Sequence, residues 1–464
     1  MPTSRLSALD ASFLAVESTN AHMHVGWVTV FDPPSDRPPP TFADCRDHIA
    51  ARLSRAPRFR QMLAPTPLGL GAPTWVDDPG FDINRHLVRS RSRGLTGAVD
   101  WFLSKPLRRD RPLWQICVAD QLADGRTAVI GKAHHCMVDG IAAVEIATLL
   151  VDPEPDPPPP EPDRWVAQPG PGWPGRITDA VADLARNQLH LAKIPARIAR
   201  SPGRAVGIAE RGQRAVRALV DAARPARSSS LNTQISSVRH LGRLSRPLED
   251  LLQVKRGFGV KLNDVVLAVC AGGVREFLRE HGERAIRLKT MIPVNVRGSE
   301  AADELGNRIS FMFVDLPCDE PDAVRRLREI HMATSERKRN QEAEGADDVM
   351  RSLGFTPPPV QRLASRLIAS PRAFNLTVSN IPGPREPLYM LGCELAEAYP
   401  VVPIADRHAL SIGVTTVGES AHFGLYADPE SLPEGDLLAA AIDRSIDELM
   451  GAEVVAGEAD LILA

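Results

Sequence analysis

The sequence predicts an α/β fold with mixed sheets, and three observations support this. Apolar runs with strand composition occur in both halves of the chain, for example HVGWVTVF at 24–31. Segments with helical spacing of apolar residues, such as 41–55, lie between these runs. The chain has 464 residues, 43% of them hydrophobic, and this length is typical of two large domains.

Residues 1–151 predict an N-terminal domain. Two apolar runs, 113–122 and 127–133, flank Asp124 and Gly125. An Asp-Gly pair between such runs is a strong signal for a β-hairpin. The second run stops at two adjacent histidines, so we expect these histidines at the end of a strand.

Residues 152–232 predict a linker followed by a helical crossover between the domains. The segment VDPEPDPPPPEPDRW is too rich in proline for helix or sheet. A helix is expected over roughly 177–223, and residues 176–227 hold eleven basic and four acidic residues. This basic segment therefore carries a net charge of +7 in a chain whose net charge is −3. Residues 176–223 either lie on an anionic membrane or lipid-droplet surface, or pack their apolar stripe on the protein.

Residues 233–464 predict a C-terminal domain with the same mixture of elements. Asn263 and Asp264 open a helical segment, and either residue suits an N-cap. Helices are also expected at 321–339 and 436–449. The expected strands of this half are 286–296, 309–316, 374–380, 410–417 and 421–427.

Composition excludes several classes of protein. The near-neutral charge argues against nucleic-acid binding, which needs a basic excess. Six cysteines without a CxxC pair indicate a reducing compartment, where they serve as small buried hydrophobes. The N-terminus lacks the pattern of a signal peptide, and no apolar run reaches the length of a membrane span. We therefore expect a cytoplasmic protein, with peripheral contact to the inner membrane or lipid droplets as an open alternative.

One motif carries the chemistry. His134-His135-Cys136-Met137-Val138-Asp139-Gly140 follows the second strand of the hairpin. Adjacent residues of a strand face opposite ways, so the two histidines cannot share a role. Two plainer interpretations are a core histidine with a turn aspartate, and a metal site. No further cluster of histidine, cysteine or glutamate supplies metal ligands, and the motifs GxSxG and HExxH are absent.

The motif and its neighbours resemble the bacterial wax ester synthase/diacylglycerol acyltransferase family, within the larger group of HHxxxDG acyltransferases. The resemblance covers nearly the whole chain, although Ala8 stands where the family usually has proline. Its segments are LSALDASFL, WVDDPGFDINRHL, PLW before the hairpin, HHxxxDG, NDVVLAVCAGGVREFL, MIPVNVRG, GNRISFMFVDLP and SNIPGP. The resemblance implies two acyltransferase-like domains, each a mixed sheet with packed helices, and an active-site channel at their interface.

The resemblance also implies roles for individual residues. His135 would be the general base, and His134 an orienting residue. Asp139 would hold the loop by pairing with an arginine, for which Arg297 is the candidate unless it is a plain surface charge. Asn263 and Ser379 are candidates for stabilising the oxyanion or positioning substrate. Their alternatives are a helix cap for Asn263 and a strand-to-loop turn for Ser379.

The expected function is acyl-CoA-dependent esterification of diacylglycerol to triacylglycerol, with wax ester synthesis from long-chain alcohols as the close variant. Acyl-CoA is a co-substrate, and we expect no cofactor and no metal. Two alternatives stay open: acyl transfer on a carrier-bound polyketide- or peptide-type substrate, and a non-catalytic lipid-binding or droplet protein. The sequence leaves the alcohol unspecified, because the shape of the pocket decides it.

Overall fold

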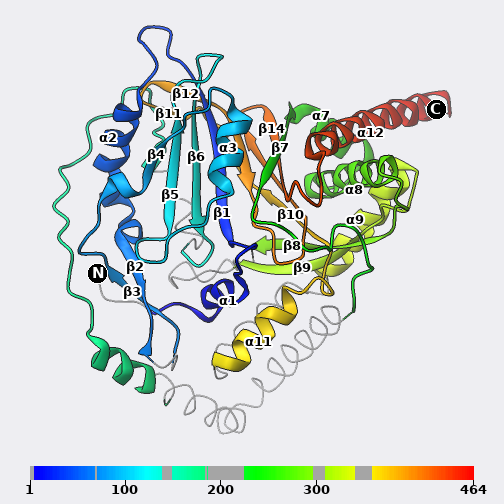
Figure 1. Cartoon of the computed structure of the whole chain (residues 1–464). Helices are drawn as coiled ribbons and strands as arrows, with labels where there is room; N and C mark the ends of the chain where they lie inside the picture. Colours follow the sequence, from blue (N-terminus) through cyan, green and yellow to red (C-terminus); the bar gives the residue numbers. More distant parts are fainter. Residues whose placement is uncertain are drawn as a thin grey trace, which may run out of the picture.

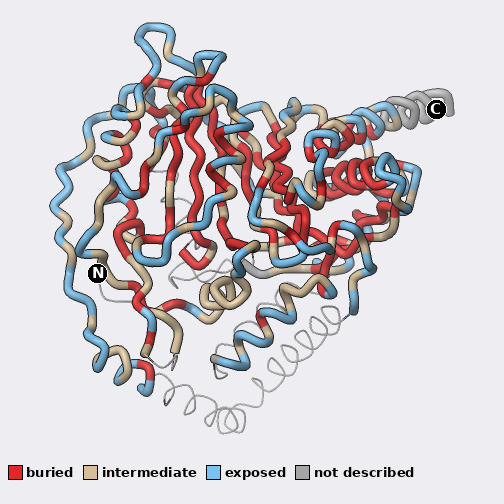
Figure 2. The backbone as a smooth tube through the Cα atoms, viewed as in Figure 1, coloured by how far each residue is buried: buried red, intermediate tan, exposed pale blue. Residues whose placement is uncertain are grey.

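The structure is a computed structural model that describes residues 5–67, 71–137, 149–182, 185, 224–295, 309–339 and 358–463. Figure 1 shows two sheets side by side, with most helices packed on the outer faces. Mixed sheets with helices confirm the predicted α/β class. Buried residues form a continuous band through both sheets and the helices that cover them (Figure 2).

The first sheet has the strand order β11-β12-β1-β6-β5-β4. All its neighbouring strands are antiparallel except β4 and β5, which are parallel. The predicted hairpin is confirmed as β5 and β6, joined by a turn in which Gly125 has a φ of 79°. The strands are β1 (His24–Asp32), β4 (Leu87–Arg89), β5 (Trp114–Ala119), β6 (Thr127–His134), β11 (Tyr389–Met390) and β12 (Cys393–Val401).

Short elements surround this sheet. The helix predicted at 41–55 is an α-helix followed by a 3-10 turn. Strands β2 and β3 form a separate two-stranded ladder. The bounds are α1 (Ala8–Val16), α2 (Phe42–Arg52), η1 (Leu53–Arg55), η2 (Pro57–Arg60), β2 (Gln61–Ala64), β3 (Thr74–Asp77), η4 (Ile83–Arg85) and α3 (Leu95–Leu103).

The second sheet has the order β7-β14-β13-β10-β8-β9. β10 is parallel to both β13 and β8, and the other pairs are antiparallel. The five strands predicted in this half are all present. Its strands are β7 (His240–Pro247), β8 (Leu288–Asn295), β9 (Ile309–Leu316), β10 (Leu376–Ile381), β13 (Leu410–Val417) and β14 (Ser420–Ala427).

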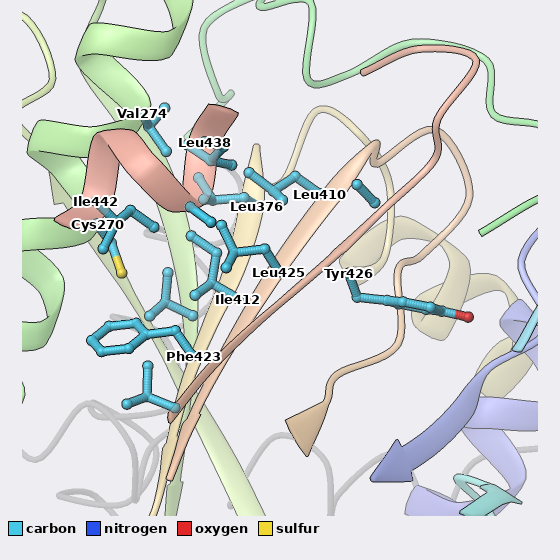
Figure 3. Packing of buried hydrophobic residues seen from close by; sticks show 14 of the residues in the cluster. Cys270, Val274, Leu376, Leu410, Ile412, Phe423, Leu425, Tyr426, Leu438 and Ile442 are labelled. Atoms are coloured by element: carbon cyan, nitrogen blue, oxygen red, sulfur yellow. The ribbon is translucent and has the colours of Figure 1, made fainter. Parts of the chain in front are cut away.

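Helices cover the outer face of the second sheet. Figure 3 shows Cys270 and Val274 of α8 and Leu438 and Ile442 of α12 packed over apolar side chains of β10, β13 and β14. The two helices predicted at 321–339 and 436–449 are present, and the second is much longer than predicted. The helices of this half are α7 (Leu248–Phe258), α8 (Leu262–Glu280), α9 (Ala323–Arg339), α11 (Pro358–Ile368) and α12 (Gly435–Leu463).

Two strands from the C-terminal half of the chain belong to the first sheet. β11 and β12 come from the C-terminal half, yet they complete the first sheet, where β12 pairs with β1 from Gly26 to Asp32. At the C-terminal end of β12, the Pro400 carbonyl oxygen approaches Gly424 of β14 closely. A Cβ atom at Gly424 would lie only 2.2 Å from this oxygen. Only glycine fits there. The division of the chain into domains therefore stays a prediction that needs this exchange added to it.

The proline-rich segment lies against the short elements that surround the first sheet. Between 153 and 172 it forms neither helix nor strand. The buried Arg52 and Asp152 pair at 2.7 Å at its start, and Arg60 pairs with Asp163 farther on. A helix follows at 173–182, at the start of the predicted 177–223, and most of the basic segment lies outside the described residues.

Candidate active site

The two histidines lie where β6 ends, as predicted. His134 is the last residue of the strand and faces His24 of β1 in the antiparallel register. The His134 N–H donates to the Leu113 carbonyl and the His135 N–H to the Met23 carbonyl, both at 2.9 Å. Both histidine backbones are thus held by neighbouring segments.

His135 is stacked on Phe13 of α1. The ring centroids are 3.7 Å apart and the planes are inclined by only 14°. Its Nδ1 atom is buried, and no described residue offers it a hydrogen bond. Burial lowers the pKa of His135 to about 4, because an apolar environment disfavours the imidazolium, and nearby His134 acts in the same direction. The ring is therefore neutral at pH 7 and has a lone pair to accept a proton.

His134 is 1% exposed and held in one orientation. Its Nδ1 accepts a hydrogen bond from the Cys136 N–H at 3.1 Å. The proton of the neutral ring is therefore on Nε2, which lies 3.7 Å from Oε1 of Glu17. Burial first, and the charge of Arg109 second, lower the pKa of His134 to about 3. These contacts fit the orienting role that the resemblance implies.

A buried lysine stands two residues before His134 on the same face of β6. Lys132 is fully buried, and its Nζ donates to the carbonyls of Phe102 and Lys105 at 2.6 and 2.5 Å. Those carbonyls lie at the C-terminal end of α3, where a helix favours cations. Burial lowers the Lys132 pKa to about 7, with a further contribution from the charge of Lys105. Lys132 thus ties β6 to α3 directly beneath the histidine turn.

The remaining candidate of the motif is Asp139, with Arg297 as its expected partner. Asp139 and Arg297 both lie outside the described residues. Their roles, and the ion pair expected between them, stay predictions.

Asn263 lies in the first turn of α8 and is half-buried. Neither Asn263 nor Asp264 is the N-cap, which corrects that expectation, because the helix begins at Leu262 and the cap is Lys261. The Asp264 carboxylate instead accepts hydrogen bonds from the Lys261 N–H, from His331 and from Thr334. Asp264 thereby links α8 to α9, and a role of Asn263 toward the oxyanion or substrate stays a prediction.

Ser379 lies in β10, in the middle of the second sheet, where it pairs with Gly413 of β13. Ser379 is buried, and the turn that follows is closely packed. A Cβ on Gly383 would lie 1.7 Å from the Thr416 carbonyl, so the turn requires glycine there. Among the described residues, no hydrogen bond joins Asn263 or Ser379 to either histidine.

Three residues of this site are missing from the sequence-based predictions: Phe13, Glu17 and Arg109. Phe13 and Glu17 are four residues apart and so share one face of a helix, which the sequence could have shown. Their approach to His134 and His135 depends on the packing of α1, which the sequence does not show.

Neither a metal-binding cluster nor a single membrane-spanning helix is found among the described residues. No group of three or more histidine, cysteine, aspartate or glutamate side chains among them could hold a metal ion. No single helix in this part of the chain is long and apolar enough to cross a membrane; α7 and α8 pass that test only as a pair bent by 106°. α8 is the buried core helix of the second sheet.

Family comparisons cover most of the chain. Residues 6–266 match the wax ester synthase/diacylglycerol acyltransferase catalytic domain, and residues 305–450 match the WS/DGAT C-terminal domain. The chain is 31% identical over 457 residues to tgs1 of Mycobacterium tuberculosis strain H37Rv, described as a probable diacylglycerol O-acyltransferase. That match covers 96% of this chain and 95% of the relative.

Solved structures agree with these matches. The wax ester synthase/diacylglycerol acyltransferase from Marinobacter aquaeolei VT8 superposes with a TM-score of 0.68 at 25% identity, covering 97% of this chain and 99% of that one. The starter condensation domain of rhizomide synthetase RzmA superposes with a TM-score of 0.58 at 16% identity, covering 97% and 94%. The second likeness shows a shared fold.

Proposed function

Because this chain belongs to the wax ester synthase/diacylglycerol acyltransferase family, we propose that it is an acyl-CoA-dependent O-acyltransferase that esterifies diacylglycerol to triacylglycerol. Wax ester synthesis from long-chain alcohols is the close variant of the same chemistry. The observation that carries the proposal is His135, a neutral imidazole held at the end of β6. Acyl-CoA is the second substrate, and the chemistry needs no cofactor and no metal.

The reaction follows from the properties of His135. The ring accepts the hydroxyl proton as the alcohol oxygen attacks the thioester carbonyl, so that the C–O bond forms without a free alkoxide. The C–S bond then breaks, and the imidazolium returns the proton to the departing CoA thiolate. General base catalysis of this kind contributes roughly 10²–10⁴ in rate. Both steps use one histidine and need no covalent acyl-enzyme.

The tetrahedral intermediate needs a hydrogen-bond donor for its oxyanion. Asn263 and Ser379 are our candidates for that donor or for positioning substrate, since both lie in the second half of the chain in segments typical of the family. Removing one such donor typically lowers the rate by about 10²–10³. Asp139, paired with Arg297, would hold the loop that follows the histidines.

Product formation from labelled palmitoyl-CoA tests this function. We expect ester from diacylglycerol with the wild-type enzyme, and a loss of at least about 10²-fold in His135→Ala. His281→Ala, which changes a half-exposed histidine after α8, is the matched control and should keep wild-type activity. Ester from hexadecanol alone would move the assignment to wax synthesis. No ester from either alcohol would favour the carrier-dependent or the non-catalytic alternative.

We further propose that the protein contacts a lipid surface through residues 176–223 and adjacent segments. Two described helices on this side support the proposal, because both expose apolar side chains. Trp173 and Val181 are exposed in the helix at 173–182, and Leu363 and Leu367 are exposed in α11, which also carries Arg362 and Arg366. Exposed apolar residues beside arginines are typical of helices that lie on anionic membranes.

Flotation with liposomes tests this contact. The full chain should float with vesicles that contain anionic lipid, and the variant that lacks 176–223 should float less. Replacing Leu363 and Leu367 with serine should weaken flotation further. Equal flotation of all three proteins would contradict the proposal.

A further inference from the structure

α1 and the residue that caps its C-terminal end contact both histidines. Phe13 stacks on His135, and Glu17, at the end of the same helix, approaches His134. The Glu17 N–H also donates to the Phe13 carbonyl at 3.2 Å, which fixes the spacing of the two residues. A shift of α1 would therefore move the contacts of both histidines together.

The contact between Glu17 and His134 has a defined polarity. Because Nδ1 of His134 accepts from the Cys136 N–H, the N–H of the ring is on Nε2, and a carboxylate oxygen of Glu17 lies 3.7 Å from that nitrogen. That Nε2 atom is buried and has no hydrogen-bond partner at normal distance among the described residues. A carboxylate is the one side chain that attracts this N–H without offering a competing donor.

Glu17 is in turn held by Arg109. The two side chains form an ion pair, with the carboxylate 21% exposed. Arg109 belongs to the segment between α3 and β5, so the pair joins α1 to the base of the hairpin that carries the histidines. Burial lowers the pKa of Arg109, as expected for a guanidinium drawn partly out of water.

We propose that Glu17 and Arg109 are positioning residues of the acyltransferase site: their ion pair fixes α1, so that Phe13 holds the ring of His135 and Glu17 orients His134. This inference rests on the proposed function, in which His135 is the base. Neither residue needs to touch substrate. Both act through the position and the electrostatic environment of the histidine turn.

The pair also sets the charge balance at the turn. The groups that face His134 are His24 from β1, Arg109 and Glu17, and Lys132 lies below it on β6. Glu17→Gln removes the negative charge and leaves Arg109 unopposed, which disfavours the protonated form of the histidines at this turn. Arg109→Met leaves the carboxylate alone, which favours an imidazolium. The acid limb of kcat/KM should move to lower pH in the first variant and to higher pH in the second.

Kinetics of the full chain test the proposal. We expect kcat to fall by about 10- to 100-fold in Glu17→Gln and in Arg109→Met, the cost of misplacing a catalytic group. The KM for palmitoyl-CoA should change little. The double variant should keep the loss of kcat but recover an acid limb near that of the wild type. Arg108→Met is the matched control and should behave as wild type. Arg108 is the neighbour of Arg109 in the sequence, but it forms an exposed ion pair with Asp110.

An activity-independent measurement separates this inference from the proposed function. Spectra of the ¹⁵N-histidine-labelled full chain report the tautomer and pKa of each ring, with His134→Asn and His135→Ala as assignments. Glu17→Gln should alter the signals of His134 and His135 and leave those of His281 unchanged. Unaltered signals, or acid limbs that stay in place in both single variants, would overturn the positioning role. If the wild-type enzyme forms no ester, the proposed function is wrong. The spectra would still show whether Glu17 and Arg109 hold the two histidines in place.

Discussion

At the scale of single residues, the site combines a low proton affinity with a fixed ring. Stacking on Phe13 removes water from one face of His135, and burial keeps the imidazole neutral. A base with a lowered pKa attracts the hydroxyl proton less strongly, but it is in the reactive form at every pH near neutrality. Fixed geometry therefore contributes more to this site than basicity does.

The pH dependence of the wild-type enzyme follows. The protonated form of His135 cannot act as a base, so kcat/KM should fall as the pH drops through its pKa. With that pKa lowered to about 4, the acid limb should lie well below 6.5. Short assays between pH 4.5 and 8, each followed by re-assay at pH 7, would measure it. An acid limb at the ordinary histidine value would show that the ring is solvated in the working enzyme.

At the scale of elements, α1 explains why Ala8 is compatible with the family pattern. Ser7 is the N-cap, and its side chain accepts from the Asp10 N–H at 3.0 Å, which makes Ala8 the first helical residue. Proline is favoured at that position, because the N–H it lacks has no partner inside the helix. Alanine and proline thus both allow the helix that carries Phe13 and Glu17.

Ala8→Pro should therefore be neutral or stabilising. Proline restricts the unfolded chain, and at a compatible site this raises the free energy of unfolding by about 0.4–1 kcal/mol. Urea unfolding of the full chain would measure the change. Ala11→Pro, inside the same helix, is the control and should be strongly destabilising, because its N–H donates to the Ser7 carbonyl.

The composition of each strand explains whether the sequence predicted it. β1, β5, β6, β13 and β14 were predictable because apolar and β-branched residues dominate their runs. β7 and β12 were missed because their exposed faces carry charged residues. Within the site, the motif predicted the position of the two histidines, whereas Glu17 and Arg109 were out of reach because only tertiary packing brings them there.

At the scale of the whole molecule, buried histidines make stability depend on pH. His22, His24, His48 and His134 are all buried, and burial lowers the pKa of each below 6.5, to about 4 for His22 and His48. In the unfolded chain they bind protons near pH 6.5, and in the folded chain they do not. The unfolded state then binds more protons, so stability rises with pH through this range.

The protein should accordingly be fully stable above about pH 6.5 and lose stability as the pH falls towards 4. Each such histidine contributes a loss of about 1.4 kcal/mol per pH unit once the pH is well below its unfolded pKa. Urea midpoints between pH 7.5 and 5 would reveal the slope. His48→Gln should reduce the slope, because it removes one of these buried histidines. A midpoint independent of pH would contradict the burial of these rings.

The position of β12 in the first sheet sets the order in which the chain can fold during synthesis. The first sheet needs a strand that leaves the ribosome only after most of the second sheet has been made. Until then, the nascent chain exposes the backbone edge of β1 in an otherwise formed lobe, and unpaired edges recruit other strands. Fragments that end before residue 389 should therefore self-associate, and a peptide covering 389–401 supplied in trans is the segment that would complete them.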